Sequence, residues 1–302
     1  MEKKEANKGI SIYVIKIIAL ISMTFDHVGF FMMNSYTFDN SYIIGYVLRF
    51  VGRLSLPLFI FALIEGLKHT SNIKRHILML GIEAIGIYAI MLILQSVTNF
   101  DFGLQGNIFI SLFLFALSYY FLFYAKHKWL VVFPIIYIVI SFGLKLMLSF
   151  DVIDLKSFVA LPYINGLLLQ YDIISSLLFF GPLIGYKLYD NQIKKRLVSQ
   201  DNIDAFSSTN DYQRSKNGIV CIIIAFIALI CYLITYLPLY EEGLNELIDG
   251  GLQSAMLFAC IVIYFYNGKK GHTSKLSKYG FYLYYPIHVA IIYFVFYLIF
   301  GY

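Results

Sequence analysis

The chain has 302 residues, of which 60% are hydrophobic and only 14% are charged. Its mean hydropathy is +0.74 and its formal net charge is +5. These values exclude an ordinary soluble domain and predict a polytopic protein of the lipid bilayer. We expect the bilayer, and no nucleic acid, among its partners.

Apolar runs long enough to cross roughly 30 Å of hydrocarbon predict about nine transmembrane helices. These runs cover residues 12–33, 42–67, 74–97, 107–125, 129–149, 171–188, 217–238, 251–267 and 279–300. We therefore predict an all-α, polytopic helical bundle that forms a single domain over residues 1–302. Residues 158–170 are apolar but short and are broken by Pro162 and Gly166, which suits a re-entrant or interfacial element.

Lysine and arginine are unevenly distributed among the connections, and positively charged connections stay on the cytoplasmic side. Alternate connections carry Lys3, Lys4 and Lys8, then Lys68, Lys74 and Arg75, then Lys126 and Lys128, then Lys187, Lys194, Lys195, Arg196, Arg214 and Lys216, then Lys269, Lys270, Lys275 and Lys278. The opposite connections carry essentially only Lys156. We predict a multi-pass protein of the cytoplasmic (plasma) membrane, with its N-terminus inside and its C-terminus outside. Residues 189–217 then form a cytoplasmic loop, expected to be partly disordered.

Asp26 and His27 interrupt the first apolar run, where ionisable groups are costly and usually functional. A histidine can act as a general base because its ordinary pKa lies near physiological pH. Successive helical residues point about 100° apart, so we do not expect these two side chains to form a dyad with each other. His27 either takes part in chemistry or is a packed core histidine. Asp26 either supports that chemistry or is the structural counter-ion of a basic residue on another helix.

Arg49 and Arg53 are natural partners for Asp26, because they lie one turn apart on one face of the second apolar run. Two glycines near this face would let another helix approach: Gly45 and Gly52. Pro57 removes a backbone hydrogen bond and frees a carbonyl near Arg53, which predicts a kink. The arginines either only pair with Asp26 or also bind a substrate carbonyl or phosphate.

The last apolar run contains a second intramembrane histidine, His288, about one helical turn beyond Tyr284 and Tyr285. These tyrosines can hold His288 in place. In the predicted orientation His288 is nearer the inner face and His27 nearer the outer face, so the two would line opposite parts of one conduit. A core histidine bonded to a neighbouring tyrosine is the alternative.

The remaining polar groups within the apolar runs have simpler expected roles. Lys145 lies near a helix end, where we expect its side chain to snorkel towards the interface. Glu65 and Glu83 are expected to pair with basic residues at the inner ends of their helices. The cysteines, Cys221, Cys231 and Cys260, have no CxxC or metal-ligand spacing, so we expect core packing and predict no metal site.

Three patches of the sequence together resemble the TraX family of membrane proteins, which are related to F-pilin acetylase. The patches are MTFDHVG in the first apolar run, GR followed by LSLPLFIFALIEGLKHT in the second, and FYLYYPIHV in the last. More distantly, a histidine on the first helix followed by a PLFIF-type second helix looks like the transmembrane acyltransferases that include lysosomal heparan-glucosaminide acetyltransferase. The resemblance covers residues 16–296, with residues 87–275 similar in hydropathy alone.

This resemblance implies transfer of an acetyl or other short acyl group from cytoplasmic acyl-CoA to an amine or hydroxyl of an extracytoplasmic peptide, glycan or lipid acceptor. His27 would take a proton from the acceptor, and Arg53 and Arg49 would stabilise the oxyanion or position the thioester. Asp26 would orient the arginines or His27. The candidate residues for binding acetyl-CoA, or another acyl-CoA, are His288, Tyr285, Lys16, Lys68 and Arg75.

A proton-coupled transporter or flippase is the main alternative, in which a proton or substrate path through the membrane is formed by Asp26, Arg53, Glu83 and His288. A tunnel from an inner basic mouth to His27 would favour the acyltransferase, provided that it is wide enough for a pantetheine arm and too narrow for a whole solute. A third possibility is a scaffold for envelope assembly that keeps these residues without using them.

Overall fold

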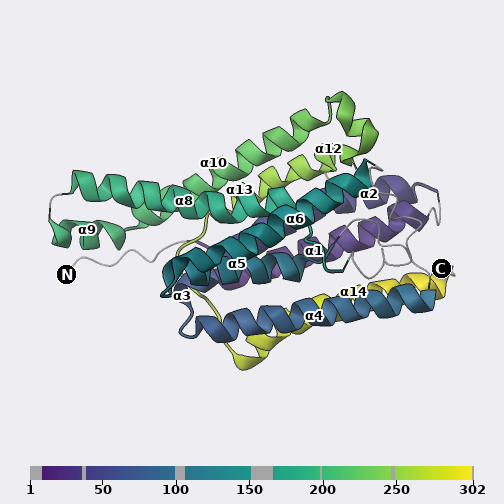
Figure 1. The fold of residues 1–302 in the computed structure, drawn as a ribbon, viewed down its shortest axis with the longest axis horizontal. Coiled ribbons are helices and arrows are strands. Elements are labelled where there is room, and N and C mark those ends of the chain that lie inside the picture. The colour runs from purple at the N-terminus through teal and green to yellow at the C-terminus, as the bar shows by residue number, and fades with distance from the viewer. Residues whose placement is uncertain are drawn as a thin grey trace.

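The computed structural model describes residues 9–35, 39–98, 106–150, 166–197, 199–245 and 249–300. Within these ranges the regular structure is helical, with two isolated β-bridges, Ile10 to Tyr266 and Asn107 to Leu169. Figure 1 shows the helices running along one long axis as a bundle, with one end of α8, α9 and α10 extending beyond the rest. The predicted all-α, polytopic membrane bundle is confirmed.

The elements in chain order are α1 (Ile12–Ser35), α2 (Ser41–Gly52), α3 (Ser55–His69), α4 (Ile73–Thr98), α5 (Ile108–Phe123), η1 (Lys128–Val131), α6 (Val132–Ser149), α8 (Asp172–Arg196), α9 (Gln200–Ser207), α10 (Asn210–Ile234), η2 (Tyr240–Leu244), α12 (Gly250–Gln253), η3 (Ser254–Phe258), α13 (Ala259–Tyr264) and α14 (Lys275–Phe300). Helix α3 is central, because it is buried on all sides and packs against α1, α5, α8 and α13. Helices α4 and α14 lie side by side (Figure 1).

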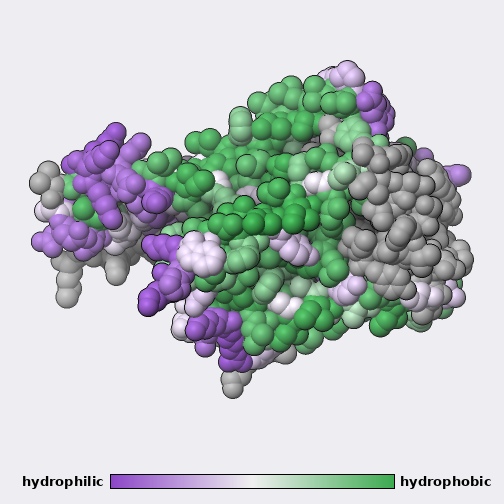
Figure 2. All heavy atoms as spheres, in the orientation of Figure 1, coloured by the Kyte–Doolittle hydropathy of each residue, from purple (hydrophilic) through white to green (hydrophobic). Residues whose placement is uncertain are grey.

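Six helical stretches of the described residues are long and apolar enough to cross a membrane. They are Ile12–Met33, Ser41–His69, Ile73–Ile93, Lys128–Ser149, Asn210–Ile234 and Tyr279–Ile299. Two predicted runs correspond to shorter apolar helices, Ile108–Phe123 and Gly250–Tyr264, and the run at 171–188 lies in α8, which ends in a polar segment. Figure 2 agrees with this pattern, since apolar side chains cover the middle of the bundle and polar ones gather at the end on the left of the view.

The predicted run at 42–67 is divided into two helices, α2 and α3, by a break at Arg53 and Leu54. Pro57 lies in the first turn of α3 and has no N–H to donate to the carbonyl of Arg53. The predicted kink is confirmed. It places Arg53 at a helix junction, where its side chain turns towards α1 and the start of α8.

The polar stretch at 189–217 is more ordered than predicted, since most of its described residues are helical. Ser199 and Thr209 provide N-caps, because their hydroxyls accept hydrogen bonds from backbone N–H groups at the starts of α9 and α10. Tyr212 of α10 also donates a hydrogen bond of 2.8 Å to Asp190 of α8. The expectation of partial disorder was therefore wrong, because local capping and cross-helix bonds order this segment.

Connections predicted to be cytoplasmic meet at one end of the bundle. The N–H of Ile10 donates to the carbonyl of Phe265 at 2.9 Å, and the ammonium of Lys270 donates to the carbonyl of His69 at 2.9 Å. Arg75 donates to the hydroxyl of Tyr279 at 2.8 Å. The segments before α1, between α3 and α4, and before α14 therefore form one surface.

Two expectations concern the end of the bundle opposite the basic connections, namely the position of Lys145 and the segment 158–170. Lys145 does not snorkel, because it is 3% exposed and its ammonium lies 3.0 Å from the carboxylate of Asp172 on α8. The predicted re-entrant segment 158–170 lies mostly outside the described residues. Its last residues, 166–170, pack into the bundle, where Asn107 and Leu169 form a bridge.

Glycines bring α1 and α2 into close contact beside Asp26, as the spacing of Gly45 and Gly52 predicted. A Cβ on Gly45 would lie 2.7 Å from the carbonyl oxygen of Gly29, and a Cβ on Gly52 would lie 2.6 Å from the Cα of Asp26. Neither position has room for a side chain, so the glycines set the distance between Asp26 and the arginines of α2.

Changing Gly52 to alanine is expected to destabilise the protein by about 1–3 kcal/mol, because the added methyl group overpacks the contact between α1 and α2. The matched control is Gly86→Ala in α4, where a Cβ meets no heavy atom within 4 Å. Thermal unfolding of both variants in the same detergent checks this. An unfolding midpoint for Gly52→Ala equal to that of Gly86→Ala would contradict the close contact.

Candidate functional site

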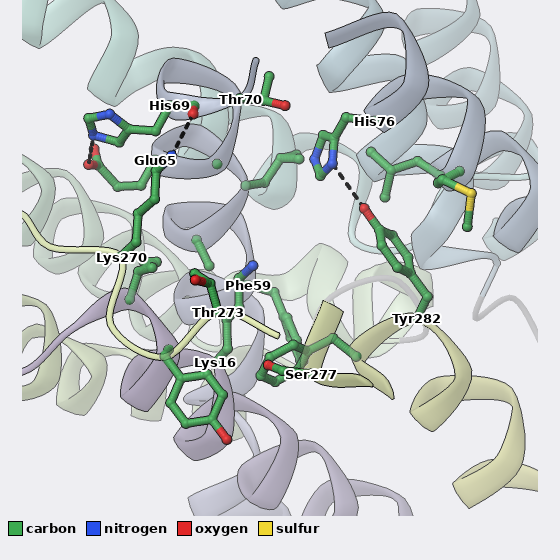
Figure 3. Close-up of a pocket in the computed structure, with 18 of the residues that line it drawn as sticks. Lys16, Phe59, Glu65, His69, Thr70, His76, Lys270, Thr273, Ser277 and Tyr282 are labelled. Atoms are coloured by element: carbon green, nitrogen blue, oxygen red, sulfur yellow. Dashed lines mark hydrogen bonds and ion pairs between the residues drawn. The ribbon is translucent and has the colours of Figure 1, made fainter. Parts of the chain in front are cut away.

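A cavity of about 780 Å³ opens at the end of the bundle where the basic connections meet (Figure 3). Its size lies within the range of small-molecule and cofactor sites, roughly 300–1,000 Å³. Helices α1, α3, α4, α5 and α14 supply its walls together with the segment before α14. Its basic side chains are Lys16, His69, Arg75, His76, Lys270 and His272. We call this the basic cavity.

The polar wall of the basic cavity is partly fixed by internal contacts (Figure 3). Glu65 accepts hydrogen bonds from Lys68 at 2.6 Å and from Tyr266 at 3.2 Å, as expected for an acid at the inner end of its helix. The ring Nδ1 of His76 and the hydroxyl of Tyr282 lie 2.9 Å apart. These bonds hold the wall in shape around Lys16, Lys270 and Arg75.

The three lysine and arginine candidates for acyl-CoA binding lie in two different places. Lys16 and Arg75 line the basic cavity. Lys68 instead faces away, because it pairs with Glu65 and its ammonium lies 4.0 Å from the centre of the Tyr186 ring. The spacing of charges along the sequence could not separate these directions, since all three lie near the same helix ends.

A second, small cavity of about 60 Å³ adjoins the basic cavity deeper in the bundle. Its lining includes Asp26, His27, Tyr171 and Tyr285 among mostly apolar side chains. Four residues line both cavities, which makes them a shared wall: Phe59, Phe109, Leu112 and Phe281. We call the second space the histidine cavity. His27 therefore lies deeper in the bundle than the basic cavity, on the other side of this shared wall.

His27 and His288 are in direct contact, with 2.7 Å between the Nδ1 of His27 and the Nε2 of His288. The expectation that they line opposite parts of a conduit was therefore wrong. Helix α14 begins at Lys275, one turn earlier than the apolar run at 279–300 indicated, and the two histidines lie at the same level in the bundle. The aromatic rings of Tyr284 and Tyr285 pack on His288, with centroid separations of 5.0 and 5.4 Å.

The hydrogen bonds of His288 determine which nitrogen of His27 carries a proton. The Nδ1 of His288 lies 2.8 Å from the carbonyl oxygen of Tyr284, which can only accept, so this Nδ1 carries the proton. In the neutral pair the Nε2 of His288 then accepts from the Nδ1–H of His27. The Nε2 of His27 is left with its lone pair, which is the form a general base requires.

Asp26 lies between the two arginines of the second apolar run. Its Oδ1 is 3.8 Å from the Nε of Arg49 and 3.7 Å from the Nε of Arg53. Asp249 approaches both arginines from the other side, at 3.7 and 3.6 Å. The hydroxyl of Tyr171 accepts a hydrogen bond of 2.7 Å from the Nη1 of Arg53. We call these five residues the charged cluster.

Several polar atoms of the charged cluster are buried and have no hydrogen-bond partner among the described residues. They are Oδ1 of Asp26, Nε of Arg49, and Nε and Nη2 of Arg53. Arg53 is only 3% exposed. Its nitrogens lie 3.7 Å from the carboxylate of Asp26 and 3.6 Å from that of Asp249, which is longer than a hydrogen bond. Guanidinium donors in this state can bind an oxygen of a ligand, and they lie next to the histidine cavity through Asp26 and Tyr171.

The predicted catalytic residues therefore lie together, with His27 and Asp26 in the histidine cavity and the two arginines beside Asp26. Sequence reasoning missed Tyr171 and Asp249. Tyr171 follows an apolar stretch without helical periodicity, and Asp249 ends an acidic stretch that resembles a solvated loop. Neither position has a sequence signal that connects it to Arg53.

Comparisons with known proteins agree with the resemblance found in the three patches. The family model described as TraX protein matches residues 11–182, more than half of the chain. A probable fimbrial assembly protein FimC, serogroup H1, from Dichelobacter nodosus is 26% identical over 292 residues, which cover 95% of this chain and 96% of that protein. No solved structure matches the chain.

Proposed function

Because this chain belongs to the TraX family, we propose that it is a membrane-embedded acyltransferase. It moves an acetyl or other short acyl group from cytoplasmic acyl-CoA to an amine or hydroxyl of an extracytoplasmic acceptor. The observation that carries this proposal is the basic cavity adjoining a small cavity that contains His27. This arrangement suits a donor with an anionic head and a narrow reactive arm.

The donor binds from the basic end. Lys16, Arg75 and Lys270 offer cations to the phosphates of acyl-CoA, with the planar guanidinium able to make two parallel bonds. The pantetheine arm then extends past the shared wall and brings the thioester to His27. In this proposal the basic end faces the cytoplasm of a cell whose plasma membrane holds the protein, and the N-terminus lies inside.

The proton positions in the histidine pair support a transfer step in which His27 acts as the base. The Nε2 of His27 takes a proton from the acceptor nitrogen or oxygen as that atom attacks the thioester carbonyl. The carbon to sulfur bond breaks, and His27 returns the proton to the departing CoA sulfur. His288 keeps His27 in the required tautomer, and Tyr285 contacts the acyl group from the cavity wall.

The charged cluster supports the same step from the predicted outer side. The unpartnered nitrogens of Arg53 and Arg49 hold the acceptor or stabilise the oxyanion, and Asp26 orients both arginines. The D. nodosus relative is a probable fimbrial assembly protein, which supports an acceptor among envelope components such as a peptide N-terminus or a glycan.

Equilibrium binding of radiolabelled acetyl-CoA to the purified protein in nanodiscs tests the donor site. Replacing Arg75 with glutamine is expected to weaken binding about tenfold or more, because a charge-assisted contact to phosphate is lost. The control is Lys195→Gln, an exposed cation near the end of α8.

Saturable binding that Arg75→Gln weakens and Lys195→Gln leaves unchanged supports the proposal. Absence of saturable binding to the wild type overturns it. In that case uptake of solutes into liposomes, without consumption of acyl-CoA, would support the transporter instead.

A further inference from the structure

A short segment ahead of α8, Leu168–Gln170, is held by polar groups of α5, its N-cap residue and α6. The carbonyl of Leu168 accepts from the N–H of Asn107 at 2.8 Å. The N–H of Leu169 donates to the hydroxyl of Ser141 at 2.9 Å. The carbonyl of Leu169 accepts from the ammonium of Lys145, and the N–H of Gln170 donates to the hydroxyl of Ser111 at 3.2 Å. The backbone of this segment is therefore fixed before α8 begins.

A buried ion pair closes the same arrangement at the start of α8. Lys145 and Asp172 are 3% and 5% exposed, and their charged atoms lie 3.0 Å apart. The hydroxyl of Ser141, which accepts from the N–H of Leu169, donates to the carboxylate of Asp172 at 2.8 Å. A fully paired charge in a low-dielectric interior is well suited to specify one geometry. We call Ser111, Ser141, Lys145 and Asp172 the polar clamp.

Tyr171 lies between the two parts of the polar clamp and has a left-handed backbone conformation, with φ 58° and ψ 17°. Residues with a side chain rarely adopt this conformation, and it persists where the surrounding structure enforces it. The conformation directs the Tyr171 hydroxyl to the Nη1 of Arg53 at 2.7 Å. It also places Tyr171 in the lining of the histidine cavity with His27.

We propose that Tyr171, fixed by the polar clamp, is a positioning residue that sets the direction of the Arg53 guanidinium for acyl transfer. This inference rests on the proposed acyltransferase function. Arg53 has one nitrogen committed to Tyr171 and two that have no hydrogen-bond partner among the described residues. The bond to Tyr171 fixes the plane of the guanidinium, and so fixes where its remaining donors point.

The test is Tyr171→Phe, which removes the hydroxyl and keeps the ring. We expect kcat to fall about tenfold or more, the effect of losing one hydrogen bond to a charged group. The KM for acyl-CoA stays unchanged, because Tyr171 does not line the basic cavity. Ser141→Ala loosens the polar clamp and is expected to lower kcat in the same way. The matched control is Tyr232→Phe on an exposed face of α10. This variant also loses a hydroxyl contact, the one to Tyr236.

The outcomes separate this inference from the proposed function. Turnover by the wild type together with an unchanged kcat in Tyr171→Phe overturns the role of Tyr171 alone. An equal loss in Tyr171→Phe and Tyr232→Phe, or a rise in KM for acyl-CoA with kcat unchanged, also overturns it. Absence of turnover in the wild type overturns both proposals.

Discussion

Replacement of His27 by glutamine is expected to lower acyl transfer at least about 100-fold, the lower part of the range for a general base. Glutamine can still bond to His288, but it has no nitrogen that can accept a proton at neutral pH. Binding of acyl-CoA is expected to stay within about twofold of the wild type, since a change of that size is well below 1 kcal/mol and His27 lies outside the basic cavity. Label transfer and acetyl-CoA binding, measured on the same nanodisc preparation, check both values.

The matched control for His27→Gln is His127→Gln, the same substitution at an exposed position before η1. It should transfer acyl groups at the wild-type rate. Transfer by His27→Gln at more than a tenth of the wild-type rate would show that the base lies elsewhere.

Neutralising Asp26 is expected to have the largest effect on stability. Asp26→Asn leaves Arg49 and Arg53 close together, and among the described residues the partly exposed Asp249 is their remaining acidic partner. Removal of one partner from a buried ion network costs about 3–5 kcal/mol, because the remaining charges are uncompensated. The free energy of unfolding in a mixed-detergent titration measures this loss.

A double variant separates charge balance from packing at the same position. Asp26→Asn combined with Arg49→Gln removes one charge of each sign, so part of the lost stability should return. The surface control is Asp201→Asn on α9, which is exposed and should unfold like the wild type. A double variant less stable than the sum of its two single variants would contradict a network based on charge balance.

The sequence predicts the membrane class and most helices because hydropathy over about 20 residues directly reflects the thickness of the bilayer. It also makes His27, Asp26, Arg49 and Arg53 candidates for the site, since ionisable groups stand out within apolar runs. The kink at Pro57 follows from its missing N–H. These are local properties, so they can be read without knowing which helices are neighbours.

Contacts between distant segments could not be predicted in this way. The bond between His27 and His288 depends on the level at which α14 lies against α1, and an error of one turn in the start of α14 was enough to separate them. The burial of Lys145 depends on Asp172 from another helix, and no sequence pattern connects the two. Tyr171 reaches Arg53 only because the polar clamp enforces a conformation that local preferences disfavour.

Transfer of radiolabel from acetyl-CoA by the purified protein in nanodiscs, with a mixture of envelope peptides, glycans and lipids as acceptors, tests the central claim most directly. We expect the wild type to label one acceptor class and to release CoA in equal amount, and we expect His27→Gln to do neither. Absence of label in every acceptor, or equal labelling by both proteins, would contradict it.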